Sequence, residues 1–241
     1  MSLTGKYILI TGAAVRVGRA MTLAMAQAGT NVIIHYGSST EAAQKTQADA
    51  AALGVEAYTI QADLNNSEQV NALIDRTAEF GKLFALVNNA AIFDPIDLAE
   101  TDLEAWERHL RINLTAPFVL SKAFAAHVGK DREGRIVNIL DWRALRPGRD
   151  HLPYTISKAG LAALTQSTAI ELAPNITVNG IAFGAILPPS DGGDPEKAIA
   201  DIPAGRWADL DEVGDTLRFL LDGPAYITGE IVHLDGGRHL L

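Results

Sequence analysis

Short apolar runs alternate with longer stretches of helical periodicity along the whole 241-residue chain. Seven runs rich in β-branched residues predict strands: YILI, NVIIHY, AYTI, FALVNN, RIVNIL, ITVNGIAF and EIVHL. Apolar positions at helical spacing predict helices over Val17–Ala28, Glu41–Ala52, Glu68–Phe80, Leu103–Val128, Tyr154–Leu172 and Leu210–Leu221. This alternation indicates an α/β fold, a doubly wound parallel sheet of about seven strands with helices on both faces.

The chain shows no linker or internal repeat, so residues 1–241 are predicted to form a single domain. One segment breaks the rhythm: LPPSDGGDP, residues 187–195, follows a predicted strand end. It reads as a surface loop or as a substrate lid, because ligands of open α/β sheets bind beyond the carboxyl ends of the strands. We expect a lid around residues 185–206.

Charge and composition exclude several classes of function. The formal net charge of −9 argues against a nucleic-acid or anionic-membrane binder, which needs a basic face. There is no cysteine, so disulfide and thiolate chemistry are excluded, and no apolar run approaches the roughly 18 residues of a membrane span. The apolar stretch in MSLTGKYILITG is too short for a signal peptide, so a cytoplasmic location is expected. The six histidines lack paired ligand spacing, so no metal site is expected.

The stretch TGAAVRVG, residues 11–18, joins the first predicted strand to the first predicted helix. Free N–H groups and the helix dipole at such a junction favour a bound phosphate. Gly12 and Gly18 suit a tight turn and a close approach, but Arg16 stands where a second glycine is expected. Taken alone, the loop is equally compatible with an ordinary turn between a strand and a helix.

The stretch YTISK places Tyr154 and Lys158 on one face of a predicted helix. A nearby ammonium favours the phenolate and brings the pKa of a tyrosine toward neutrality, although ordinary exposed pairs share this spacing. Asp141 ends a strand thirteen residues earlier, and Asn113 interrupts the apolar face of the longest predicted helix. Because QADL and VNNAA also end strands, these polar groups are expected at one edge of the sheet.

In chain order these motifs resemble the short-chain dehydrogenase/reductases: Thr11-Gly12…Gly18, Asp63, Asn88-Asn89-Ala90, Asn113, Tyr154…Lys158, Asn179-Gly180 and ITGEIVHLDGG. The resemblance covers essentially the whole chain and implies a single Rossmann domain, a nicotinamide cofactor and a homotetramer. It implies that Tyr154 donates or accepts the proton and that Lys158 holds the nicotinamide ribose and tunes Tyr154. Asn113 would support a proton-relay water, and Asp63 would contact the adenine.

Three positions depart from the common pattern of that family: Arg16 in the glycine loop, Asp141 in place of the usual serine, and Phe183-Gly184 in place of proline-glycine. The first two resemble the pteridine reductases, with the bacterial dihydromonapterin reductases close by, and Phe93 in NNAAIFDP matches that branch. We therefore expect a small, pterin-like substrate held by Arg16, Phe93, Asp141 and Tyr154. The hypothesis is hydride transfer to the pteridine ring, with a protonated Tyr154 and Asp141 managing the proton.

The end of the second strand favours NADP(H) as the cofactor. NAD sites usually place an acid there, whereas this chain has His35-Tyr36-Gly37-Ser38-Ser39, whose serines can donate to a 2′-phosphate. The predicted cofactor-binding residues are Gly12, Arg16, Val17, Gly18, His35, Tyr36, Ser38, Ser39, Asp63, Leu64, Asn89, Ala90, Ala91, Tyr154, Lys158, Gly184 and Ile186.

Two other functions compete with this hypothesis. A generic carbonyl reductase of 3-oxoacyl thioesters, sugars or steroids predicts serine at position 141, where the chain has Asp141. A non-catalytic NADP-binding sensor predicts loss of Tyr154 or Lys158, and both are present. The tail of residues 238–241 could reach the active site of a neighbouring subunit.

Overall fold

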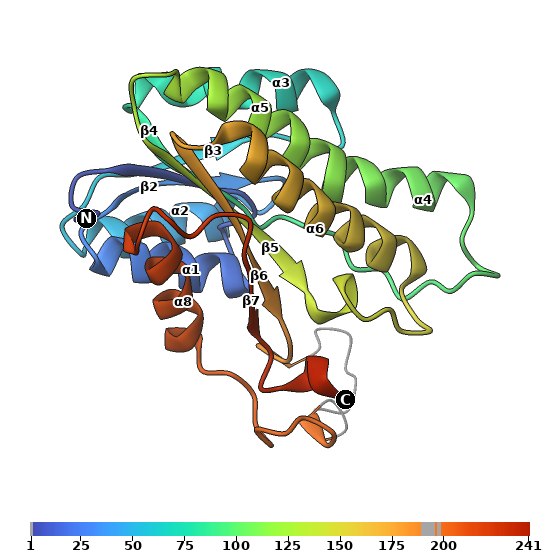
Figure 1. The fold of residues 1–241 in the computed structure, drawn as a ribbon. Helices are drawn as coiled ribbons and strands as arrows, with labels where there is room; N and C mark the ends of the chain where they lie inside the picture. The colour runs from blue at the N-terminus through green and yellow to red at the C-terminus, as the bar shows by residue number, and fades with distance from the viewer. Residues whose placement is uncertain (1, 189–195, 197–198) are drawn as a thin grey trace.

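The computed structural model describes residues 2–188, 196 and 199–241. Its seven strands are all parallel and form one sheet in the order β3-β2-β1-β4-β5-β6-β7 (Figure 1). The strands are β1 (Tyr7–Ile10), β2 (Asn31–Tyr36), β3 (Ala57–Gln61), β4 (Leu83–Asn88), β5 (Gly134–Asp141), β6 (Ile176–Phe183) and β7 (Ile231–Leu234). The predicted fold class is confirmed.

Helices cover both faces of the sheet (Figure 1). They are α1 (Arg16–Gln27), α2 (Thr40–Ala51), α3 (Ser67–Arg76), α4 (Leu103–Leu110), α5 (Ala116–Val128), α6 (Leu152–Leu172) and α8 (Leu210–Asp222). Successive strand side chains point to opposite faces, so Ile8 and Ile10 pack with Met21 of α1, whereas Leu9 packs with Phe124 of α5. Nearly every position of the five inner strands β1, β2, β4, β5 and β6 is buried, which explains their continuous apolar runs, whereas the edge strands β3 and β7 each have a single buried position.

The prediction of one continuous helix from 103 to 128 is wrong. A π-helical turn, η2 (Arg111–Thr115), separates α4 from α5. Pro117 follows Asn113 by four residues, so it cannot donate to the Asn113 carbonyl and its ring crowds that carbonyl. The wide turn relieves the conflict, and the Asn113 side chain is fully buried.

The strand order reverses at β1, with β2 on one side and β4 on the other. In open α/β sheets this reversal opens a crevice at the carboxyl ends of the strands, where ligands bind. The polar residues predicted at one sheet edge follow β1, β3, β4 and β5, so the topology gathers their segments around this crevice.

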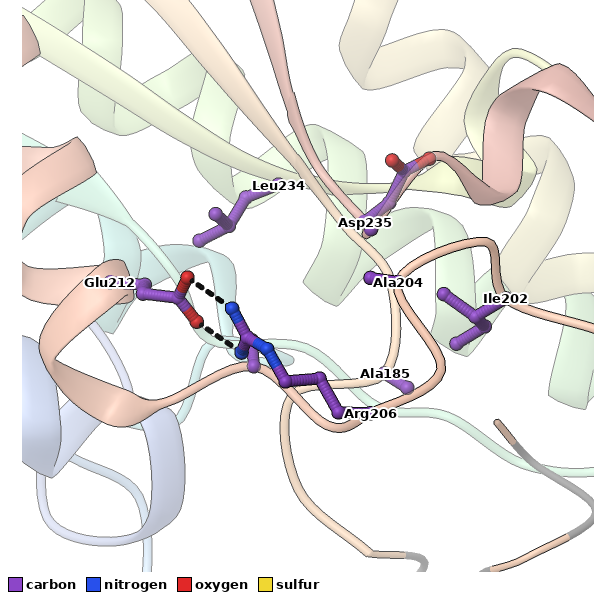
Figure 2. A pocket seen from close by; sticks show the side chains of 9 residues that line it. Ala185, Ile202, Ala204, Arg206, Glu212, Leu234 and Asp235 are labelled. Carbon is purple, nitrogen blue, oxygen red and sulfur yellow. Dashed lines mark hydrogen bonds and ion pairs between the residues drawn. The ribbon is translucent and has the colours of Figure 1, made fainter. Parts of the chain in front are cut away.

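The predicted lid lies partly outside the described residues, which omit 189–195 and 197–198. Its carboxyl-terminal end is hydrogen-bonded to the segments that follow β7 and β6: Ala204 N donates to Gly236 O (3.0 Å), and Ala208 N, two residues beyond the predicted lid, donates to Ala185 O (3.0 Å). Figure 2 shows the small pocket beneath this segment, where Arg206 makes two 2.8 Å bonds to the Glu212 carboxylate. Tyr154 and Lys158 are absent from its lining.

None of the described helices has the length and apolar character needed to cross a membrane. Among the described side chains, no cluster of three histidine or acidic residues is arranged to hold a metal ion.

Candidate active site

Close packing accounts for both glycines of the loop that follows β1. Gly12 has φ +62°, and a Cβ on Gly18 would lie 2.1 Å from the Gly12 carbonyl oxygen. Asn89 Nδ2 donates to Thr11 O (2.7 Å) and Gly12 O (3.1 Å), and Thr11 Oγ1 accepts from the amides of Asn89 (2.9 Å) and Ala90 (3.0 Å). Thr11 is therefore a site residue that our prediction of individual residues omitted.

Arg16 occupies a backbone conformation that favours glycine, with φ +51°. Its side chain is exposed, and Nη2 donates to Pro188 O at 3.1 Å. No described contact joins Arg16 to Phe93, Asp141 or Tyr154, whereas Tyr154 contacts both Phe93 and Asp141, so the structure brings together three of the four predicted substrate ligands. The position keeps the shape of the glycine loop while presenting a cation at its rim.

Two helix N-termini at the crevice lack a side-chain cap. Val15 precedes α1 and Ser39 precedes α2, and neither side chain makes a capping hydrogen bond. Ser38 and Ser39 are exposed beside the second terminus. Uncapped N–H groups with adjacent hydroxyls suit phosphate groups, so these residues fit a dinucleotide that carries an additional phosphate.

Asp141 and Tyr154 form the polar centre of the site. Tyr154 Oη donates to Asp141 Oδ2 at 3.2 Å, and Asp141 Oδ1 accepts from the Arg143 amide at 2.8 Å. Burial raises the pKa of Asp141. Burial, and then the Asp141 charge, hold the pKa of Tyr154 well above its ordinary value. The phenol is thus held in its protonated form.

Lys158 lies beneath this pair, 2% exposed, and Nζ donates to Ile139 O at 2.6 Å. Burial lowers the pKa of Lys158 to about 8, against the opposing charge of Asp141. Its ammonium lies 5.7 Å from the Tyr154 ring centroid, whereas Asp141 contacts the hydroxyl directly. The raised pKa of Tyr154 agrees with the expectation of a protonated phenol, and tuning of Tyr154 by Lys158 stays a prediction.

Asn113 ties three segments of the site together. Its Oδ1 accepts from Ile92 N (2.9 Å), and its Nδ2 donates to Ile92 O (3.0 Å) and Ser157 Oγ (3.1 Å). Ser157 Oγ donates in turn to Tyr154 O at 2.6 Å. Ser157 is a fully buried residue that sequence reasoning missed, although it lies inside the YTISK motif.

Phe93 is 49% exposed and lies against Tyr154, with the ring centroids 4.6 Å apart and nearly perpendicular. His151 stacks on Phe93 at 3.9 Å and 12°. His151 covers one ring face in this way, and about half of the Phe93 side chain stays exposed. The guanidinium of Arg143 lies 5.7 Å from the Phe93 centroid. Our sequence reasoning missed both His151 and Arg143.

The remaining predicted cofactor residues differ in exposure. Asp63 and Ala91 are exposed, Val17, Tyr36 and Ala90 are half-buried, and Leu64, Ile186 and the ring of His35 are buried. A Cβ on Gly184 would lie 2.6 Å from Asp235 Cα, so close packing alone requires glycine there.

The carboxyl-terminal tail reaches its own site. Within η4 (Arg238–Leu240), the Arg238 guanidinium lies 4.5 Å from the ring of Trp142, the residue after Asp141. The alternative, insertion into a neighbouring subunit, stays a prediction.

A doubly wound sheet with a glycine loop and a Tyr–Lys pair at its carboxyl edge defines a short-chain dehydrogenase/reductase, an oxidoreductase. A family model described as Enoyl-(Acyl carrier protein) reductase matches residues 12–239, and the chain belongs to this family.

Similar proteins carry different names. A 3-oxoacyl-[acyl-carrier-protein] reductase from Synechocystis sp. is 36% identical over 98% of both chains. FolM alternative dihydrofolate reductase 1 from Brucella canis, complexed with NADP, is 33% identical with a TM-score of 0.92 over 100% of this chain and 97% of that one. A blue fluorescent protein from a metagenomic library, complexed with NADPH, is 31% identical with a TM-score of 0.89 over 98% of this chain and 99% of that one. The cofactors of these two structures agree with the predicted NADP(H).

Proposed function

We propose that this enzyme is an NADPH-dependent reductase that transfers hydride to a pteridine ring, reducing a dihydropterin or pterin toward the tetrahydropterin. The observation that carries the proposal is the 3.2 Å hydrogen bond from Tyr154 to Asp141, at the position where the family usually has serine. The similarity to a protein named alternative dihydrofolate reductase adds support.

The cofactor proposal follows from the crevice. The uncapped N-terminus of α1 would hold the pyrophosphate, and Ser38 and Ser39 would donate to the 2′-phosphate at the N-terminus of α2. Asp63 and Leu64 would border the adenine, and Lys158 would hold the nicotinamide ribose. Bound NADPH would supply a hydride.

Asp141 matters because reduction of a ring C=N bond adds hydride to carbon and a proton to nitrogen. Tyr154 would give that proton from Oη, and the Asp141 carboxylate opposes premature loss of it. A simple ketone instead develops negative charge on oxygen, which a neighbouring carboxylate repels. The site therefore favours a nitrogen acceptor.

Phe93 would supply the stacking surface for the flat ring. His151 holds one face and the Tyr154 ring meets it nearly perpendicularly, so its orientation is set before the substrate arrives. A stacked pair is worth roughly 0.5–1.5 kcal/mol beyond the buried area. Arg16 would turn from Pro188 to the pterin and pyrophosphate, using its planar donor groups.

A second candidate is reduction of 3-oxoacyl thioesters, because the Synechocystis relative carries that name. The two candidates differ at position 141, where a carboxylate disfavours the ketone. Assembly as a homotetramer, a lid around 185–206 and a cytoplasmic location remain predictions.

The test is NADPH oxidation with dihydrobiopterin, dihydromonapterin, dihydrofolate and acetoacetyl-CoA. We expect turnover of at least one dihydropterin, and Asp141→Ser should lower its kcat at least tenfold. Asp150→Asn is the matched control, because Asp150 also binds Arg143, at 3.2 Å, but is half exposed and does not contact Tyr154. Reduction of acetoacetyl-CoA without any dihydropterin activity would refute the proposal and support the second candidate.

A further inference from the structure

The ring of His35 lies under the glycine loop with both nitrogens engaged. Gly12 N lies 3.1 Å from Nδ1, and Nε2 lies 3.1 Å from Ala62 O. An amide can only donate, so Nδ1 must accept, and the neutral ring then carries its proton on Nε2 and donates it to Ala62 O. Burial lowers the pKa of His35 to about 4, which favours this neutral form.

The backbone of the same residue strengthens the connection. Ala13 N donates to His35 O at 2.9 Å, so His35 holds two consecutive amides of the loop. His35 pairs with Ile60 of β3, while its neighbour Ile34 pairs with Ile10 of β1. It therefore lies between the loop after β1 and the turn after β3.

Those two segments border opposite ends of the adenosine part of the proposed cofactor site. Gly12 belongs to the loop that would receive the pyrophosphate, and Ala62 immediately precedes Asp63 and Leu64, the residues proposed for the adenine. The ring is 2% exposed, so it joins the segments from below instead of facing a ligand.

We propose that His35 is a positioning residue that holds the glycine loop and the turn after β3 at the spacing that the adenosine half of the cofactor requires. The proposal rests on the NADP(H) function proposed above. It predicts that both ring contacts of His35 are needed together: loss of either the contact with Gly12 N or the contact with Ala62 O leaves the two segments no longer joined through the ring.

Three variants test this unit. His35→Asn places an amide oxygen near Nδ1 and keeps an acceptor for Gly12, whereas His35→Gln reaches the position of Nε2 and keeps a donor for Ala62 O. His35→Ala keeps neither contact. We expect all three to weaken binding of NADPH and of adenosine 2′,5′-bisphosphate by a similar factor of about tenfold, as loss of a buried hydrogen bond does. The loss should appear in the KM for NADPH far more than in the kcat at saturating NADPH.

His109→Asn and His109→Gln are the matched controls. His109 is also a fully buried histidine with backbone contacts, at Ala105 O (2.8 Å) and Asp94 N (3.5 Å), but it lies in α4. These controls should lower stability without changing affinity for adenosine 2′,5′-bisphosphate. Equal losses in both series would show general destabilisation and overturn the proposal.

Other outcomes are equally decisive. Wild-type affinity of His35→Asn for NADPH and the bisphosphate would show that only the contact with Gly12 matters. It would refute the proposal that His35 sets the spacing between the glycine loop and the turn after β3. Wild-type affinity in all three variants would refute any positioning role, whereas a folded wild-type protein that binds neither NADPH nor the bisphosphate would refute the proposed function itself. In the cofactor-free wild-type protein, nitrogen NMR should show the Nε2–H tautomer of His35; the Nδ1–H tautomer would contradict the geometry.

Discussion

Acid should destabilise the folded protein through His35, because the buried ring of this residue resists protonation. The pKa falls from 6.5 to about 4 on folding, mainly through burial, with the Ala62 carbonyl opposing and Arg76 adding slightly. Below pH 6.5 His35 becomes protonated in the unfolded chain but stays neutral in the folded protein, so the free energy of unfolding declines as the pH falls toward 4. Above the unfolded pKa this contribution is constant. The full effect is about 3 kcal/mol.

Urea unfolding of the cofactor-free protein between pH 7 and pH 4 measures this effect. The free energy of unfolding of the wild-type protein should fall by about 3 kcal/mol more than that of His35→Asn, which cannot titrate. Burial also lowers the pKa values of His127, His151 and His233, but their effects cancel in the difference between the two proteins. Parallel stability curves for the two proteins would show that His35 is not held neutral by its surroundings.

Three further predictions concern the loop and the catalytic centre. Gly18→Ala should reduce NADPH affinity at least tenfold in calorimetric titration and lower stability by about 1–3 kcal/mol, because the added Cβ meets the Gly12 carbonyl; unchanged affinity would contradict the loop packing. Asp141→Asn should make the phenolate absorbance of Tyr154 appear at lower pH, because the substitution removes a negative charge that raises the pKa of Tyr154. The Asp141→Asn/Tyr154→Phe double variant identifies which absorbance belongs to Tyr154, and a titration that does not move in Asp141→Asn would argue against the coupling of the two residues. Phe93→Ala should raise the dihydropterin KM roughly three- to tenfold at constant kcat in steady-state assays, and an unaltered KM would exclude stacking.

The sheet and most helices could be predicted because burial repeats along the chain at fixed intervals. The helices predicted from Glu41 and from Leu210 begin and end within one residue of α2 and α8. The π-helical turn at Asn113 escaped prediction because the apolar period continues on both sides of it. Pro117, four residues later, was the available signal.

Spacing alone could predict the candidate site only where a motif lies within one segment, and the family resemblance added the approach of Asp141 and Phe93 to Tyr154. Tyr154 and Lys158 share a helix, so spacing placed both, but it could not show that Lys158 reaches the Ile139 carbonyl on another element. Arg143 and His151 were missed for the same reason. Their contacts with Phe93 cross roughly fifty residues of chain, and no local pattern encodes such distances.

At Arg16, whose backbone is left-handed, the residue that suits stability differs from the residue that suits the proposed activity. A non-glycine residue there costs about 1–2 kcal/mol of conformational energy, which Arg16→Gly should recover as a higher melting temperature. If Arg16 also contacts the pterin, the same change removes a substrate ligand. Directed evolution for heat tolerance alone should therefore replace this arginine by glycine, whereas selection for turnover should retain it.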